Sequence, residues 1–137
     1  MATRILVIND PKEILEMFQL LLEGEGYEVV LSSYPILKAS EIEEIRPELI
    51  VLDLIFGQEK LGWQMLQMLK MQRPTQTIPV ILCIAALQAV REQEGYLIAQ
   101  GVEIIYKPFD INTFLTLVHN TLQSHKKNLE SVSEQNE

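Results

Sequence analysis

Short apolar runs alternate five times with amphipathic segments along this chain, and this alternation restricts its fold more than any other feature. Apolar residues of the intervening segments recur at helical spacing, as in the stripe of Ile14, Phe18, Leu21 and Leu22. Near-continuous apolar strands that alternate with helices are typical of a parallel sheet covered on both faces. The runs with the length and β-branched content of buried strands are Arg4–Ile8, Glu28–Leu31, Leu49–Leu52, Pro79–Ile84 and Val102–Tyr106.

Size and charge narrow the class of protein. The 137 residues are enough for one domain, which we expect over residues 1–123, followed by a polar tail over residues 124–137 that we expect to be disordered. A formal net charge of −8 disfavours direct nucleic-acid binding. No apolar run reaches the roughly 20 residues of a membrane helix, and the first residues lack a secretory signal. The single cysteine, Cys83, suits a reducing cytoplasm, where we expect the protein to reside.

Three charged residues follow three of the predicted strands: Asp10, Asp53 and Lys107. Right-handed crossovers bring the carboxyl ends of parallel strands to one edge of the sheet. In a doubly wound sheet of order 2-1-3-4-5, the first and third strands flank the point where ligands bind. Two carboxylates and an ammonium group would meet there, an arrangement that suits a divalent cation and a phosphoryl group.

The segments around these residues resemble a known family. The segments ILVINDPKEIL, PELIVLDL, IPVILCIAA and GVEIIYKPFD are similar to those of receiver domains of two-component response regulators. The resemblance covers roughly residues 3 to 123, and the VLDL and KPF segments are its most diagnostic parts. It implies a flavodoxin-like (βα)5 fold, an α/β doubly wound parallel sheet.

The resemblance also implies roles for individual residues. Asp53 matches the aspartate that accepts a phosphoryl group from a histidine kinase, and Lys107 matches the lysine that pairs with the phosphoryl oxygens. Asp10 and Asp53 match carboxylate ligands of Mg²⁺, the implied cofactor. Ile55 stands where a backbone carbonyl completes the metal site, and Pro108 matches a proline that follows a cis peptide bond.

Three positions depart from the family pattern. Asn9 replaces the usual first acid and predicts weaker Mg²⁺ binding. Ile84 replaces a Ser or Thr whose hydroxyl contacts the phosphoryl group, and Ile104 replaces the aromatic residue that moves with it. Tyr106 adjoins Lys107, and strand alternation places it on the opposite face from that lysine. Compared with the family pattern, the loop after Asp53 is about one residue longer before Gly62.

Two functional interpretations remain open from the sequence. The first is a stand-alone response regulator that accepts a phosphoryl group from a histidine kinase or phosphotransfer protein and signals to a downstream protein. The second is a pseudo-receiver adaptor that keeps the fold as a binding surface. In neither case do we expect a metabolic enzyme, a membrane contact or a nucleic-acid contact. The family's helix 4–strand 5–helix 5 face is the place where a homodimer would form, and Tyr96–Ile98 supply apolar residues near it. A flavin-binding protein is disfavoured because no Gly-rich or Ser/Thr-rich phosphate loop follows Ile8.

Overall fold

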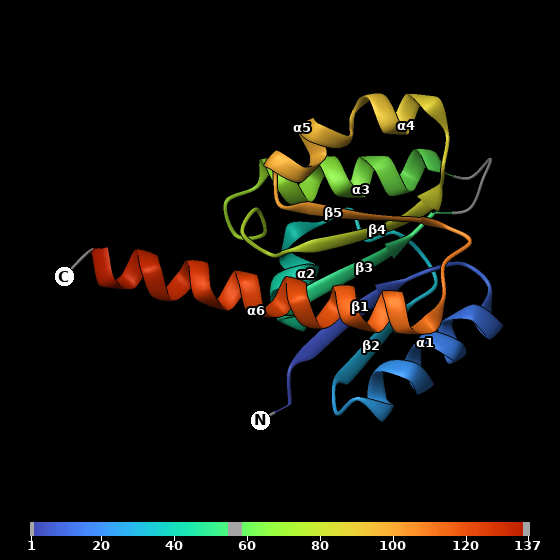
Figure 1. Ribbon diagram of the computed structural model, residues 1–137, viewed down its shortest axis with the longest axis horizontal. Helices are drawn as coiled ribbons and strands as arrows, with labels where there is room; N and C mark the ends of the chain where they lie inside the picture. Colours follow the sequence, from blue (N-terminus) through green and yellow to red (C-terminus); the bar gives the residue numbers. More distant parts are fainter. Residues whose placement is uncertain (1, 55–58, 136–137) are drawn as a thin grey trace.

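The computed structural model describes the backbone of residues 2–54 and 59–135, and the side chains of residues 2–54 and 60–127. Within this part of the chain, a parallel five-stranded sheet has helices on both faces (Figure 1). The strand order is β2-β1-β3-β4-β5, as the alternation predicts. The strands are β1 (Arg4–Ile8), β2 (Glu28–Ser32), β3 (Leu49–Asp53), β4 (Val80–Ala85) and β5 (Val102–Lys107).

The helices divide between the two faces of the sheet. One face packs against α2, α3, α4 and α5, through buried residues such as Ile42, Leu69 and Leu97. The other face packs against α1 and α6, through residues such as Phe18 and Phe114. The helices are α1 (Lys12–Gly24), α2 (Ala39–Ile45), α3 (Glu59–Met71), α4 (Gln88–Glu92), α5 (Glu94–Ala99) and α6 (Ile111–Gln135).

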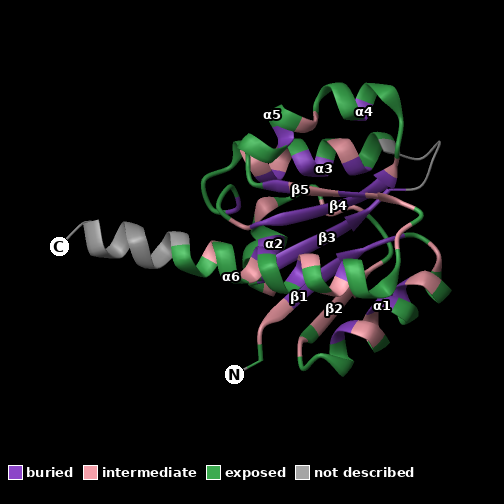
Figure 2. Cartoon of the chain, in the orientation of Figure 1, coloured by how far each residue is buried: buried purple, intermediate pink, exposed green. Residues whose placement is uncertain are grey.

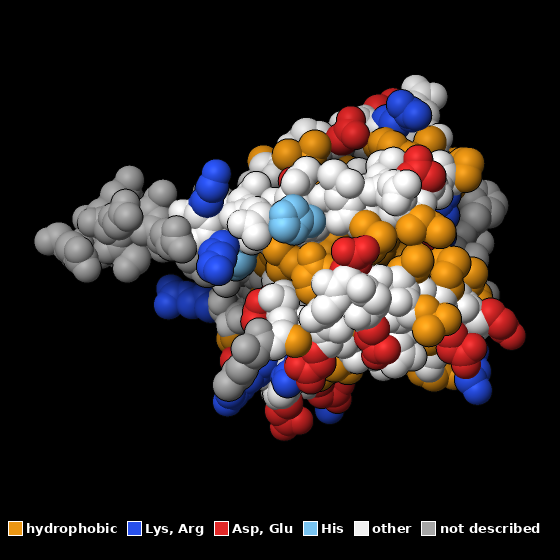
Figure 3. Space-filling view, turned by 60° about the horizontal axis from the view of Figure 1, so that its bottom comes forward, with side chains coloured by type: hydrophobic (Ala, Val, Ile, Leu, Met, Phe, Trp, Pro, Cys, Tyr) orange, Lys and Arg blue, Asp and Glu red, His pale blue; other side chains and the backbone are white. Residues whose placement is uncertain are grey.

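The three central strands, β1, β3 and β4, are the most buried, because helices cover them on both sides (Figure 2). All five residues of β3 are buried, which explains why this run is apolar at every position before Asp53. Figure 3 looks toward the α1 and α6 side, where hydrophobic side chains stay visible at the surface. Partly buried members of that cluster include Ile14, Phe109 and Leu115.

Two helical segments differ from what the sequence predicts. The single amphipathic segment expected between the fourth and fifth strands forms two short helices, α4 and α5, which meet at Gln93. Of the three consecutive apolar residues there, Leu97 is buried, while Tyr96 and Ile98 are exposed. The last helix also continues to Gln135, through the segment expected to be a polar disordered tail. Lys, Glu and Gln are good helix formers, so a polar composition does not by itself end a helix.

Candidate functional site

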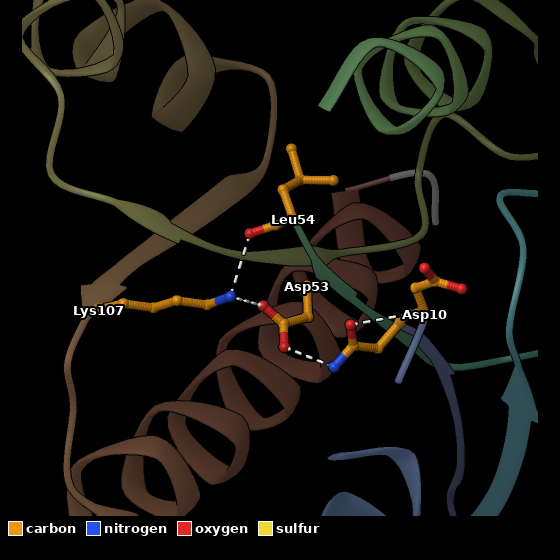
Figure 4. A network of polar contacts seen from close by, with 5 residues as sticks. Asp10, Asp53, Leu54 and Lys107 are labelled. Carbon is orange, nitrogen blue, oxygen red and sulfur yellow. Dashed lines mark hydrogen bonds and ion pairs between the residues drawn. The ribbon is translucent and has the colours of Figure 1, made fainter. Parts of the chain in front are cut away.

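The carboxyl edge of the sheet brings Asp53 and Lys107 into direct contact. Asp53 is the last residue of β3, and Lys107 is the last residue of β5. The ammonium group of Lys107 reaches across β4, forms an ion pair with Asp53 Oδ1 and donates a hydrogen bond of 3.0 Å to the Leu54 carbonyl oxygen (Figure 4). The peptide bond between Lys107 and Pro108 is cis, as the resemblance implies. The predicted convergence of these two charged residues is confirmed, while their chemical roles stay predictions.

Asn9 makes a contact with Asp53 that the sequence did not predict. Its side chain is 3% exposed, and its Nδ2 donates a hydrogen bond of 2.8 Å to Asp53 Oδ2. Its Oδ1 accepts a hydrogen bond of 2.8 Å from the backbone N–H of Asp10. A carboxylate at position 9 has no proton to donate to Asp53 at neutral pH. The Asn9 amide therefore hydrogen-bonds directly to the Asp53 carboxylate, whereas the sequence suggests only that Asn9 is a weaker metal ligand.

Asp10 follows β1 at the same edge, but its side chain has a different orientation. Asp10 is exposed, and its carboxylate points away from Asp53 in Figure 4. Both acids nevertheless line one cavity of about 380 Å³, together with Asn9, Tyr34 and Lys60. Ile55, the predicted carbonyl ligand, lies outside the described residues. Asp10 and Asp53 thus border one space at this edge.

Burial and Lys107 have opposite effects on the pKa of the Asp53 carboxyl. Asp53 is 8% exposed, and this desolvation raises the pKa of its carboxyl, because the charged form loses water. The hydrogen bond and positive charge of Lys107 act in the opposite direction and lower that pKa. Cys83, which pairs with Asp53 in the strand register, is buried, and desolvation raises the pKa of its thiol well above the usual value. A protonated Cys83 therefore acts as an apolar neighbour of Asp53 and is no candidate nucleophile.

The donor set fits a hard divalent cation in kind. Carboxylate oxygens are the ligands that Mg²⁺ prefers, and Asp10 and Asp53 offer them to one cavity. The site carries less negative charge than one with three acids, because Asn9 is neutral. Asn9 also already donates a hydrogen bond to Asp53 Oδ2. Among the described residues, no three His, Cys, Asp or Glu side chains cluster as a metal site. Waters would therefore make up much of the coordination of a bound Mg²⁺.

The two apolar replacements lie where the resemblance places them. Ile84 is 2% exposed, and it packs in one cluster with Ile104 and Tyr106. Tyr106 is the register partner of Ile84, and its hydroxyl lies 3.3 Å from Glu94 Oε1. The guanidinium of Arg91 lies 4.9 Å from the centre of the Tyr106 ring. Tyr106 thus links β5 to α4 and α5.

Comparison with known proteins identifies the family. The family model described as "Response regulator receiver domain" matches residues 5–119. The chain belongs to the response regulator receiver domain family. No helix in the described ranges 2–54 and 59–135 is both long and apolar enough to cross a bilayer.

This receiver domain is similar to parts of longer regulators. It is 28% identical over 109 residues to the DNA-binding response regulator MtrA of Mycobacterium tuberculosis, which covers 80% of this chain and 46% of MtrA. It is 29% identical over 120 residues to the DNA-binding dual master transcriptional regulator RpaA of Synechocystis, which covers 88% of this chain and 49% of RpaA. The chain thus spans about half the length of the curated relatives it matches.

Solved structures agree on the fold of the receiver domain. The signal receiver domain of a signal transduction histidine kinase from Syntrophus aciditrophicus superposes with a TM-score of 0.74 at 27% identity, over 90% of this chain and 92% of that one. The receiver domain of the sensor histidine kinase PA1611 from Pseudomonas aeruginosa has a TM-score of 0.71 at 22% identity, over 90% and 99% of the two chains. That protein was solved with a magnesium ion coordinated in the active site cleft.

Proposed function

We propose that Asp53 accepts a phosphoryl group from a phosphohistidine of a histidine kinase or phosphotransfer protein, and that the receiver domain passes this signal on by protein–protein contact. The observation that carries the proposal is the contact of Asp53 with Lys107 at the carboxyl edge of the sheet. An oxygen of Asp53 would form the new P–O bond while the P–N bond breaks. The histidine nitrogen would leave with the electron pair.

The residues of the site would supply the charge compensation that this transfer needs. The phosphoryl group develops charge on its oxygens, and a fixed cation next to the acceptor stabilises that charge. Lys107 is held by Asp53 and by the Leu54 carbonyl oxygen, so its ammonium group is already in position. A Mg²⁺ ion held by Asp10 and Asp53 would supply further positive charge to the phosphoryl oxygens when bound. Its use by this chain rests on the donor set and on the family.

One arrangement favours a second function, a pseudo-receiver adaptor without phosphorylation. Both oxygens of Asp53 already have partners, Lys107 and Asn9, and the residue is almost fully buried. Ile84 offers no hydroxyl to a phosphoryl group. In this alternative the exposed Tyr96 and Ile98, on α5 next to β5, would belong to a constitutive binding surface or homodimer face.

Transfer from a small-molecule donor separates these two functions. The protein would be incubated with phosphoramidate and Mg²⁺, and intact-mass spectrometry would follow the addition of one phosphoryl group. We expect labelling of the wild type, loss of the label in Asp53→Asn, and release of the label as inorganic phosphate by hydroxylamine, which converts acyl phosphates to hydroxamates. An unlabelled wild type would support the adaptor and exclude the phosphoacceptor.

A further inference from the structure

We infer that Lys60 is a second cation of the phosphoacceptor site, which holds the phosphoryl group opposite Lys107 and reduces the dependence of the reaction on a divalent cation. This inference rests on the proposed function of Asp53. Lys60 lies in the first turn of α3 and lines the same cavity of about 380 Å³ as Asp10 and Asp53. Neither its spacing in the sequence nor the family resemblance assigns it this part.

The charged groups around Asp53 are the first reason to assign this role to Lys60. Among the described residues that line the cavity, the acidic groups are Asp10 and Asp53, because position 9 holds a neutral amide. The cations are Lys107, which is bound to Asp53, and Lys60, which lines the cavity. The formal charges of these four groups cancel. A site with a surplus of carboxylates needs a divalent cation before a phosphoryl anion can approach, whereas a neutral site needs it less.

The place of Lys60 on its helix carries the second step. The first turn of a helix is its positive end, so a lysine there is unfavourable until an anion arrives. The three residues of this turn that line the cavity are Lys60, Leu61 and Gly62. Backbone N–H groups in a first turn have no partner within the helix, so they add to the attraction for an anion in the cavity. Lys60 and this helix end therefore act on the same ligand.

A close contact fixes this end of α3 near Asp53. A Cβ atom at Gly62 would overlap the side chain of Leu54, the residue that follows Asp53. Leu54 is buried and its carbonyl oxygen accepts the hydrogen bond from Lys107. The absence of a side chain at Gly62 therefore lets the first turn of α3 approach the end of β3. The packing of Gly62 against Leu54 therefore defines the backbone position of Lys60.

The rate of labelling with phosphoramidate, measured in Mg²⁺ and in EDTA, tests the inference. Asp53 forms the P–O bond, the P–N bond of the donor breaks, and ammonia leaves with the electron pair and a proton. We expect wild-type labelling to persist in EDTA, slower by about tenfold or less. Lys60→Gln should lose about a further tenfold in EDTA, a smaller factor than the roughly hundredfold effect of removing a preorganised donor, because Lys60 is exposed. In Mg²⁺ the loss should be smaller, since the ion supplies part of the same charge.

Mg²⁺ affinity gives a readout that a merely structural role would not produce. Removal of a cation from the cavity should tighten Mg²⁺ binding in Lys60→Gln by about threefold to tenfold, measured by isothermal titration. Lys60→Arg should keep the wild-type affinity and rate. The matched control is Lys126→Gln, which removes an exposed lysine at the opposite edge of the sheet, beside Thr3 and Glu48.

The possible results separate this inference from the proposed function. Equal rates in EDTA and equal Mg²⁺ affinities for Lys60→Gln and Lys126→Gln would overturn the part given to Lys60. Wild-type labelling that is strong in Mg²⁺ and abolished by EDTA would also overturn it, yet would leave Asp53 as the acceptor. No labelling in either medium would overturn the proposed function together with this inference.

Discussion

Replacement of Asn9 by Asp tests how the charge of Asp53 is balanced. Asn9 Nδ2 donates a hydrogen bond of 2.8 Å to Asp53 Oδ2, and both residues are buried. Asn9→Asp removes this donor and places a second carboxyl group against the first, at nearly the same size. Like charges at this separation disfavour ionisation of both groups, so the variant should be less stable than the wild type when no cation is present.

The magnitude follows from two terms. A hydrogen bond to a charged group contributes about 1.5–3 kcal/mol. The repulsion of two carboxylates about 3 Å apart is about 5 kcal/mol at an effective dielectric constant of about 20, and protonation of one carboxyl relieves most of it. We therefore expect Asn9→Asp to lower the free energy of unfolding by about 3 kcal/mol at neutral pH, or about 10 °C in Tm for a domain of this size. Mg²⁺ at about 100 times its Kd should return about 2.7 kcal/mol.

Urea unfolding in EDTA and in Mg²⁺ measures both quantities. Asn9→Ala is the matched control, because it removes the donor and adds no charge. It should cost about 1–3 kcal/mol and gain less from Mg²⁺ than Asn9→Asp. If Asn9→Asp unfolds at the wild-type urea concentration in EDTA, or if Mg²⁺ stabilises all three proteins equally, the reasoning about Asn9 is refuted.

Four further outcomes can be measured by chemical unfolding. Lys107→Met leaves Asp53 as a buried carboxylate without its cation, so we expect a loss of about 2–3 kcal/mol at neutral pH and a smaller loss near pH 4; equal losses would contradict the ion pair. Because burial raises the pKa of Asp53 above its usual 3.8, its stabilising contribution is complete below that value and is lost as pH rises through the higher folded pKa, so stability relative to Asp53→Asn should fall with rising pH. Burial lowers the pKa of Lys70 from 10.5 to about 8, so the unfolded chain binds more protons between these values. Stability relative to Lys70→Met should therefore rise by about 1 kcal/mol from about pH 7.5 to about pH 9.5, a figure reduced because the group is partly exposed; a flat difference would contradict that shift. Gly62→Ala should cost about 1–3 kcal/mol, because the new methyl group must displace the Leu54 side chain, and an unchanged urea midpoint would show that the chain yields there at little cost.

The sheet could be predicted from the sequence because its physical causes are local and repeated. Five apolar runs separated by amphipathic segments leave few arrangements other than a parallel sheet covered on both faces. The strand order then brings Asp53 and Lys107 together, and the structure confirms that contact. The handedness of the crossovers and the strand order of a doubly wound sheet were enough for this part of the site.

Other features depend on side-chain geometry that no spacing reveals. Whether Asn9 faces a metal or Asp53 depends on the rotation of one amide, and only the donor hydrogens of that amide hint at the contact observed. Lys60 lines the cavity, and α3 packs closely against Leu54 at Gly62, a side-chain contact that residue spacing does not reveal. The break at Gln93 and the length of α6 also escaped prediction, since helix ends are weakly encoded by composition.

The length of α6 has a mechanical consequence for any change at the site. The helix begins four residues after Lys107 and runs for 25 residues, or about 37 Å at 1.5 Å per residue. One end of α6 therefore follows the strand that carries Lys107, and the other end projects past the sheet (Figure 1). A tilt of about 5° at Asp110 would displace the last turn by about 3 Å. A shift of the Lys107 backbone too small to alter the sheet would thus be magnified at the far end of the molecule.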